Sequence, residues 1–65
     1  MPSSVIRNFR YYEAEQRLFV EFTTGRRYSY LGVPAKTAAD FRSAFSKGEF
    51  FNAHIRDHFN FVRER

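Results

Sequence analysis

The apolar period of this chain changes once, at Pro34, and the change divides the sequence into a strand-forming and a helix-forming half. Before Pro34, apolar and polar side chains alternate with a period of two, which is typical of strands. After it, apolar side chains recur at the three- and four-residue spacings of a helix. A chain of 65 residues has room for one domain, so we expect a single domain over residues 1–65, with an ordered core over about residues 4–61.

The half before Pro34 predicts an antiparallel meander, because its apolar stretches are rich in β-branched and aromatic residues and their connections are short. The strands are expected at residues 5–12, 17–23 and 26–31. The polar residues 13–16 form the first connection, and Gly25 allows the positive φ of a tight hairpin in the second.

A helix is expected from Ala35, because the preceding Pro34 suits the first turn of a helix. Three apolar residues would form the stripe of this helix that faces the sheet, namely Ala38, Phe41 and Phe45. The helix is expected to stop at residues 46–48, with Gly48 as the left-handed residue.

A second short helix is expected over residues 49–57, with Phe51 and Ile55 as its apolar pair. Residues 59–62 alternate and are expected to be extended and packed down, and residues 63–65 to be frayed. The predicted fold class is therefore α+β, a three-stranded antiparallel β-meander followed by two short helices packed on one face.

A high content of aromatic residues lets so small a chain form a core without a disulfide. The sequence has no cysteine, and its nine Phe and four Tyr make up 20% of the residues. Each such ring buries roughly 150–250 Å². The absence of cysteine also removes disulfides and thiolate metal sites from consideration.

The charge is basic, with 11 Lys and Arg against 7 Asp and Glu, and most of the cations are Arg. Arg forms forked contacts to phosphate and stacks on bases and rings, which favours nucleic acid as a partner. The alternative is a solvated surface whose net charge keeps the domain soluble.

The sheet face that the helices leave uncovered is expected to interleave Arg with aromatic side chains. Its members are Arg10, Tyr12, Arg17, Phe19 and Arg27, with Glu21, Thr23 and Ser29 beside them. This combination supplies the phosphate contacts and stacking surfaces that single-stranded nucleic acid needs. The same face could instead dock a protein partner or a second copy, or its Arg side chains could simply cover the rings.

Tyr28 and Tyr30 lie on one face of the third predicted strand, where two rings could stack on successive bases. They could equally be core residues whose hydroxyls reach the surface. Lys47 and Arg56 flank a turn and a helix start that could hold an anion. The alternative there is an ordinary turn capped by Ser46.

No catalytic or metal site is predicted. His54 and His58 have the i, i+4 spacing of helical zinc ligands, but the sequence offers them no cysteine and no third histidine. The serines and acids form no catalytic motif, and a domain of this size has little room for an enclosing cleft. We expect no enzyme activity, no cofactor and no small-molecule substrate.

An ordered set of residues along nearly the whole chain resembles the KTSC domain. The set comprises Ser3-Ser4, Ile6, Tyr11, Leu18-x-Val20-x-Phe22, Gly25, Tyr28-x-Tyr30, Val33-Pro34, Ser46-x-Gly48, Phe51-Asn52 and Ile55-Arg56. The Tyr-x-Tyr pair is the signature of that family, which occurs at the C-terminus of some lysyl-tRNA synthetases and as stand-alone bacterial proteins. The resemblance implies no assigned activity, and it suggests RNA binding through the association with a tRNA-handling enzyme.

The chain departs from the family pattern at three positions: Tyr12 stands where an acid is usual, and Phe41 and Phe51 stand where Tyr is common. A role that needs a hydroxyl at residue 41 or 51 is therefore not expected here.

The resulting hypothesis is a non-catalytic module, a monomer or weak homodimer, that binds RNA or DNA through the residues singled out above. The alternative is a protein-interaction or self-association module that uses the same aromatic sheet face. The N-terminal sequence lacks a basic segment followed by an apolar run, and no stretch approaches the ~18 apolar residues of a membrane span. We therefore expect a cytoplasmic location and no membrane partner.

Overall fold

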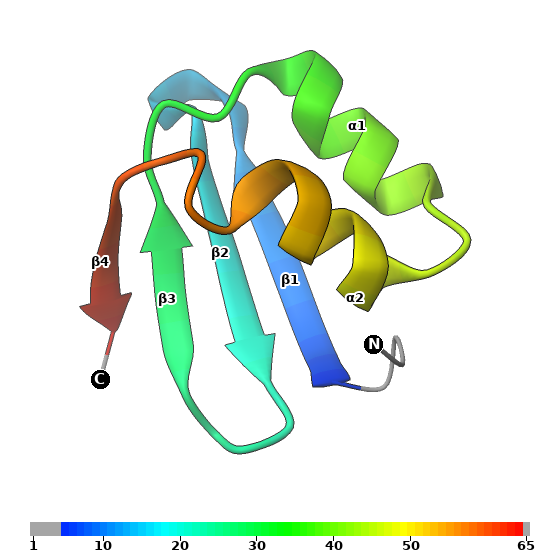
Figure 1. The fold of residues 1–65 in the computed structure, drawn as a ribbon. Coiled ribbons are helices and arrows are strands. Elements are labelled where there is room, and N and C mark those ends of the chain that lie inside the picture. The colour runs from blue at the N-terminus through cyan, green and yellow to red at the C-terminus, as the bar shows by residue number, and fades with distance from the viewer. Residues whose placement is uncertain (1–4, 65) are drawn as a thin grey trace.

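A four-stranded antiparallel sheet carries two helical segments on one face, so the expected α+β fold is confirmed (Figure 1). The computed structural model describes residues 5–64. In chain order the elements are β1 (Ile6–Tyr12), η2 (Glu13–Glu15), β2 (Arg17–Phe22), β3 (Arg27–Tyr30), α1 (Ala35–Ser43), α2 (Lys47–Phe50), η3 (Phe51–Ile55) and β4 (Phe61–Glu64). The first three strands match their predicted ranges to within one residue.

The sheet has the strand order β1-β2-β3-β4, and all neighbours are antiparallel. The β1–β2 register shifts between Ile6 and Asn8, a bulge near the start of β1. The β2–β3 turn contains Gly25 at a φ of +93°, as the hairpin prediction requires. The β1–β2 connection is a single 3-10 turn that ends at Gln16, with a φ of 49°.

The core lies between the inner face of the sheet and the helices. Its buried apolar residues are Leu18, Val20, Tyr30, Val33, Ala38, Phe41, Phe51 and Ile55. Phe41 of α1 is fully buried, and its ring centroid lies 4.7 Å from that of Phe9 on β1. The hydroxyl of Tyr11 donates to the carbonyl of Val33 at 2.6 Å, which fastens β1 to the segment that leads into α1.

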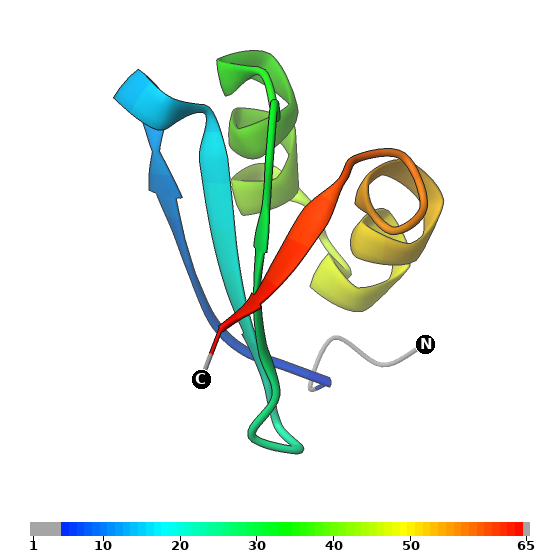
Figure 2. The same cartoon turned by 90° about the vertical axis from the view of Figure 1, so that its left-hand side faces the viewer.

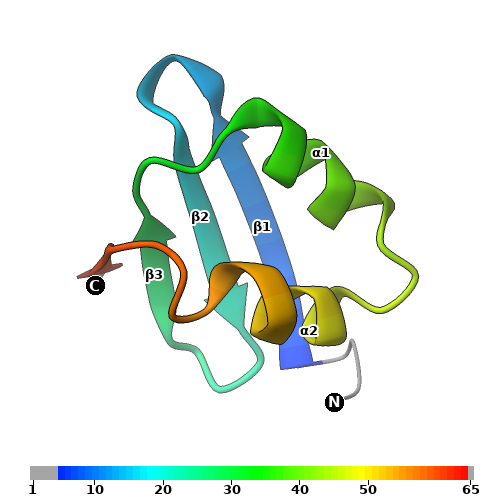
Figure 3. The ribbon, with the colours of Figure 1, turned by 45° about the horizontal axis from the view of Figure 1, so that its top comes forward.

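Both helical segments lie on the same side of the sheet, as predicted (Figures 2 and 3). Within residues 5–64, no helix or strand covers the opposite face, which we call the outer face. Ser29 is expected to be open on this face, yet it is fully buried. Arg17 donates to its hydroxyl at 3.1 Å, and that hydroxyl donates to Glu64 at 2.6 Å, so the two longer side chains cover it.

The fourth strand is the main departure from the predicted fold. Residues 63 and 64, expected to be frayed, pair with Tyr28 and Arg27 of β3, and Phe61 pairs with Tyr30. The strand is held through backbone pairing and the Ser29–Glu64 bond. Residue 65 lies outside the described residues.

The prediction that Phe45 faces the sheet is wrong, because its side chain is wholly exposed at 104%. Helix α1 ends at Ser43, and Ala44 takes an extended conformation with a ψ of 137°. The helical stripe therefore stops one turn before Phe45. Phe50 packs beside Phe41 instead, with a centroid distance of 5.9 Å.

The second helical segment spans residues 47–55 instead of 49–57, and Gly48 lies inside it without a positive φ. The prediction that Gly48 ends the first helix in a left-handed conformation is thus wrong. Ser46 starts the second segment by accepting the Glu49 N–H at 3.3 Å. Ser at the N-cap with Glu three residues later is the capping-box spacing, which sets the helix start two residues earlier.

Two Phe→Ala substitutions on either side of the end of α1 test the packing. Phe41→Ala removes a fully buried ring and should lower the free energy of unfolding by about 3–5 kcal/mol. Phe45→Ala removes a wholly exposed ring and should change it by less than about 0.5 kcal/mol. Urea denaturation followed by circular dichroism measures both, and equal losses would contradict the placement of Phe45.

Candidate functional site

An open groove with a volume of about 410 Å³ runs between strands β3 and β4 and the second helical segment. We call it the aromatic groove. Its walls include the rings of Tyr28, Tyr30, Phe51 and Phe61, and its polar residues include Arg26, Asn52, Arg56 and Asp57. Many of these residues belong to the set that carries the family resemblance, although that set was not expected to form a groove.

The aromatic walls of the groove are built by packing of rings from three elements. Tyr28 and Phe61 meet edge to face with centroids 5.3 Å apart, and Tyr30 meets Phe51 in the same way at 5.3 Å. Phe61 is 55% exposed, whereas Tyr30 is 5% exposed. The groove therefore has an exposed aromatic wall on β4 and a buried aromatic floor on β3.

The hydroxyl of Tyr30 has an unusual environment. Its pKa is raised from 10.0 to about 12, mainly by burial and then by the neighbouring Tyr28 and Asp57, and Arg56 opposes the rise. No buried side-chain oxygen or nitrogen in the described residues lacks a partner. The Tyr30 hydroxyl makes no hydrogen bond within residues 5–64, so it must touch solvent in the groove.

A π-helical turn, η3, positions the polar residues on the helical side. The N–H of Arg56 bonds to the carbonyl of Phe51 at 2.8 Å, five residues back, which widens the turn. Asn52 and Arg56 share one side of this turn, and the Arg56 guanidinium donates to the Asn52 side-chain oxygen at 3.3 Å. Single π-helical turns are frequent at functional sites.

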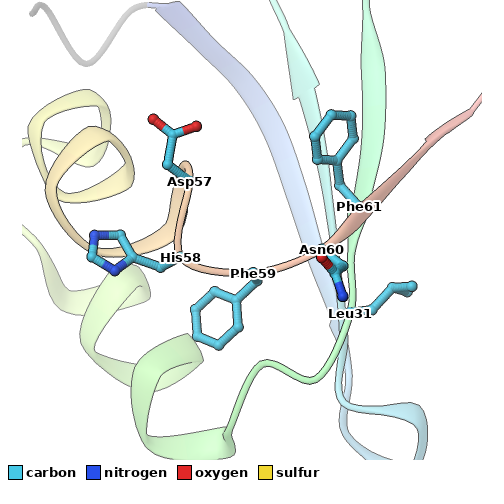
Figure 4. A pocket seen from close by; sticks show the side chains of 6 residues that line it. All are labelled: Leu31, Asp57, His58, Phe59, Asn60 and Phe61. Atoms are coloured by element: carbon cyan, nitrogen blue, oxygen red, sulfur yellow. The ribbon is translucent and has the colours of Figure 1, made fainter.

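Asp57 follows this turn in the left-handed region, with a φ of 67°, which few residues other than Gly, Asn and Asp tolerate. Figure 4 shows Asp57 and Phe61 projecting to the same side of the segment that connects the helix to β4, and Phe59 projecting to the other. The tight reversal at Asp57 thus brings a carboxylate and an exposed ring to the same groove.

On the outer face, one of the expected Arg–aromatic pairs forms, and Arg10 and Arg27 are exposed. The Arg17 guanidinium lies 4.2 Å from the centroid of the Tyr12 ring and bonds to Glu15 at 2.8 Å. The bond to Glu15 raises the pKa of Arg17. The face also carries carboxylates: Glu21 contacts Arg7 at 3.8 Å, and Glu64 accepts from Ser29.

The predicted site residues therefore divide between two surfaces. Tyr28, Tyr30 and Arg56 line the aromatic groove. The outer face carries Arg10, Tyr12, Arg17, Phe19 and Arg27. Lys47 lies apart from both, with its ammonium group donating to the Ala44 carbonyl at 3.0 Å. The register of β3 decides which face carries the Tyr pair, and it places both rings toward the helices.

Nine of the twelve groove residues were absent from the predicted binding residues, among them Arg26, Asn52, Asp57 and Phe61. The i, i+4 spacing of Asn52 and Arg56 was a usable signal, because it places both on one side of a helix. No sequence signal indicated Phe61, because its place in the groove depends on a fourth strand that pairs with β3 from the far end of the chain.

Other kinds of site find no support in the described part of the chain. No group of three or more His, Cys, Asp or Glu in residues 5–64 could hold a metal ion. His54 stacks on Phe50 with centroids 4.5 Å apart, and His58 is exposed. The helices within these residues are too short and polar to span a membrane.

Comparison with known proteins decides the family. Residues 2–59 match the family model of the KTSC domain. The chain belongs to the KTSC domain family. A crystal structure of a KTSC domain protein from Yersinia pestis superimposes on this KTSC domain with a TM-score of 0.94 and 34% identity, covering 100% of this chain and 92% of that one. The resemblance seen in the sequence is thus confirmed, although its Ser3-Ser4 element lies outside the described residues.

Relatives of this KTSC domain occur in two settings. It is 41% identical over 58 residues to part of a lysine–tRNA ligase of Nostoc punctiforme, and 34% identical over 58 residues to part of that of Trichormus variabilis. The matches cover 89% of the chain but only 10% of each ligase. A protein of Tsukamurella paurometabola is 38% identical over 62 residues, which cover 95% of this chain and 92% of that protein.

The raised pKa of Tyr30 predicts a loss of stability in alkali. The folded state holds the hydroxyl proton more tightly than the unfolded state, so stability is complete below pH 10 and falls as the pH rises toward 12. Because the hydroxyl touches solvent in the groove, the expected loss is about 1–2 kcal/mol, less than the full shift would give. Urea denaturation at pH 9 to 12 should show that wild type loses this much more stability than Tyr30→Phe. Parallel losses in the two proteins would contradict the shift.

Proposed function

We propose that this KTSC domain is a non-catalytic module that binds single-stranded nucleic acid, RNA in particular, through the aromatic groove. The observation that carries the proposal is the presence of exposed ring surface and guanidinium groups around one groove. Tyr28 and the half-exposed Phe61 offer surfaces on which bases can stack, and the exposed Arg26 and Arg56 lie beside them. Proteins that bind single strands combine such stacking surfaces with cations along the backbone path.

Arg17 of the outer face is less available to a phosphate than the arginines of the groove, although Arg10 and Arg27 of that face are exposed. Arg17 on the outer face already bonds Glu15 and Ser29, and a phosphate would have to displace those partners. Arg26, by contrast, has no ion pair within residues 5–64, and Arg56 bonds only the neutral side chain of Asn52 there. A guanidinium without a carboxylate partner is the one free to form forked contacts with phosphate.

The relatives support RNA over DNA. Several are named lysine–tRNA ligases, and this domain matches a 58-residue stretch of each. A small basic domain carried by an enzyme that handles tRNA is well placed to contact RNA. The domain's net charge of +4 agrees with a polyanionic partner.

A protein partner is the competing function, and one observation favours it. Phe45 projects wholly into solvent between α1 and α2, outside the groove. An exposed aromatic ring of this kind serves as an anchor in many protein interfaces. Binding at Phe45 would be insensitive to salt, whereas nucleic-acid binding would not.

A nuclear magnetic resonance titration with a short single-stranded RNA tests the proposal. Amide shifts should concentrate in β3, β4 and residues 47–57, and high salt should abolish them. The logarithm of the affinity should fall by about 0.7 per phosphate contact for each tenfold rise in salt. Absence of shifts at low salt with excess RNA would remove this function and leave a protein partner as the leading one.

Two double variants with the same change in charge separate the two surfaces. Arg26→Ala with Arg56→Ala should weaken RNA binding at least about tenfold and reduce the salt dependence, because charged hydrogen bonds are lost. Arg10→Ala with Arg27→Ala removes two exposed cations from the outer face and should have a much smaller effect. If the outer-face pair costs more affinity, the groove is not the binding surface.

A further inference from the structure

The Tyr30 hydroxyl lies at the floor of the aromatic groove, where it contacts solvent and bonds no described residue. Tyr30 is 5% exposed, and its hydroxyl makes no hydrogen bond within residues 5–64. Tyr11, in contrast, uses its hydroxyl to hold the Val33 carbonyl. A Phe at residue 30 could make the same ring contacts with Phe51 and Phe61. The Tyr30 hydroxyl therefore does not hold the described part of the fold together, and it can exchange its solvent contact for a hydrogen bond to a ligand in the groove.

The polar groups around this hydroxyl have complementary bonding capacity. Tyr28, Arg56 and Asp57 line the same groove as Tyr30. The Asp57 carboxylate has no hydrogen bond or ion pair among the described side chains. The hydroxyl can donate to a ligand, the carboxylate can only accept, and the Arg56 guanidinium can only donate.

The size of the groove limits what it can hold. Its volume of about 410 Å³ lies near the lower end of the ~300–1,000 Å³ typical of small-molecule sites. One base with its sugar fits such a space, and a continuous stack of bases does not. The aromatic walls suit the faces of a single base, and Arg26 is placed to meet the adjoining phosphate.

The donors and acceptors distinguish among bases. A carboxylate needs N–H groups, and guanine presents its ring N1–H and its N2 amino group side by side. The O6 of guanine, next to them, accepts a hydrogen bond and suits a hydroxyl or a guanidinium. Uracil flanks its only N–H with carbonyl oxygens, which repel a carboxylate.

We propose that the aromatic groove binds one unpaired guanine of a single-stranded RNA, with the Tyr30 hydroxyl donating to O6 and the Asp57 carboxylate accepting from N1 and N2. The inference rests on the proposed nucleic-acid binding and adds its base specificity. Tyr30 and Asp57 are then specificity-determining residues, and the surrounding rings and arginines provide affinity for any sequence.

Fluorescence anisotropy with labelled five-nucleotide RNAs tests this inference. The probes are oligouridylates whose central residue is U, A, G or inosine, and inosine differs from guanosine only in lacking the N2 amino group. Wild type should bind the G probe about tenfold more tightly than the U probe, the value of about one charge-assisted hydrogen bond. The inosine probe should bind with intermediate affinity.

Variants locate the reading groups. Tyr30→Phe removes only the hydroxyl, and Asp57→Asn keeps a residue that tolerates a positive φ. Each should lower the affinity for the G probe several-fold and reduce the preference for G over U. Tyr12→Phe removes a hydroxyl from the outer face, away from the groove, and should preserve the preference for G.

The outcomes separate this inference from the proposed function. If wild type binds all four probes equally and salt weakens them equally, the domain binds RNA and the guanine site is overturned. If wild type binds none of them at low salt, both are overturned. A preference for G that survives Tyr30→Phe and Asp57→Asn would overturn the assignment of the reading groups.

Discussion

Edge-to-face packing of aromatic rings between the sheet and the second helical segment is the interaction on which the rest of this structure depends. Phe51 meets Phe22 at 5.3 Å on one side and Tyr30 at 5.3 Å on the other, and Tyr30 continues to Phe61 at 5.6 Å. The chain has no disulfide, and these rings supply much of the buried apolar area of a small core. They also form the walls of the groove, so the core and the candidate site share the same rings.

The two faces of the sheet depend on each other through β4. On the outer face, a line of polar contacts crosses all four strands, from Tyr12 through Arg17 and Ser29 to Glu64. The last of these contacts ties β4 to β3, and β4 carries Phe61 on the opposite face. Outer-face residues therefore support the groove by holding the strand that forms its exposed wall. A loss of binding on substitution of Arg17 would be expected even if no ligand touched that side chain.

Local sequence patterns were enough to predict the first three strands and the start of the first helix. They were not enough to predict the fourth strand, whose position depends on pairing between distant residues. Alternation located β1, β2 and β3 because each has one buried face, and Pro34 located the start of α1. The four residues of β4 carry too short a pattern, and their partner strand ends at Tyr30, 31 positions before β4 begins. The end of α1 was misjudged because the apolar spacing of Phe45 continues past the point where the helix stops, although the Ser46 and Glu49 spacing marked a new helix start.

The candidate site was only partly predictable for the same reason. Residue type identified Arg and aromatic side chains as candidates on both faces, but type does not distinguish an arginine that is already bonded from one that is available. Arg17 is already bonded, because the fold brings Ser29 to its guanidinium and Glu64 to Ser29, although these two residues lie 35 positions apart in the sequence. Tyr30 is available for the opposite reason, since nothing in the described chain reaches its hydroxyl. Polar groups that bond no other described residue, and not those most common in the sequence, are therefore the candidates for ligand contacts.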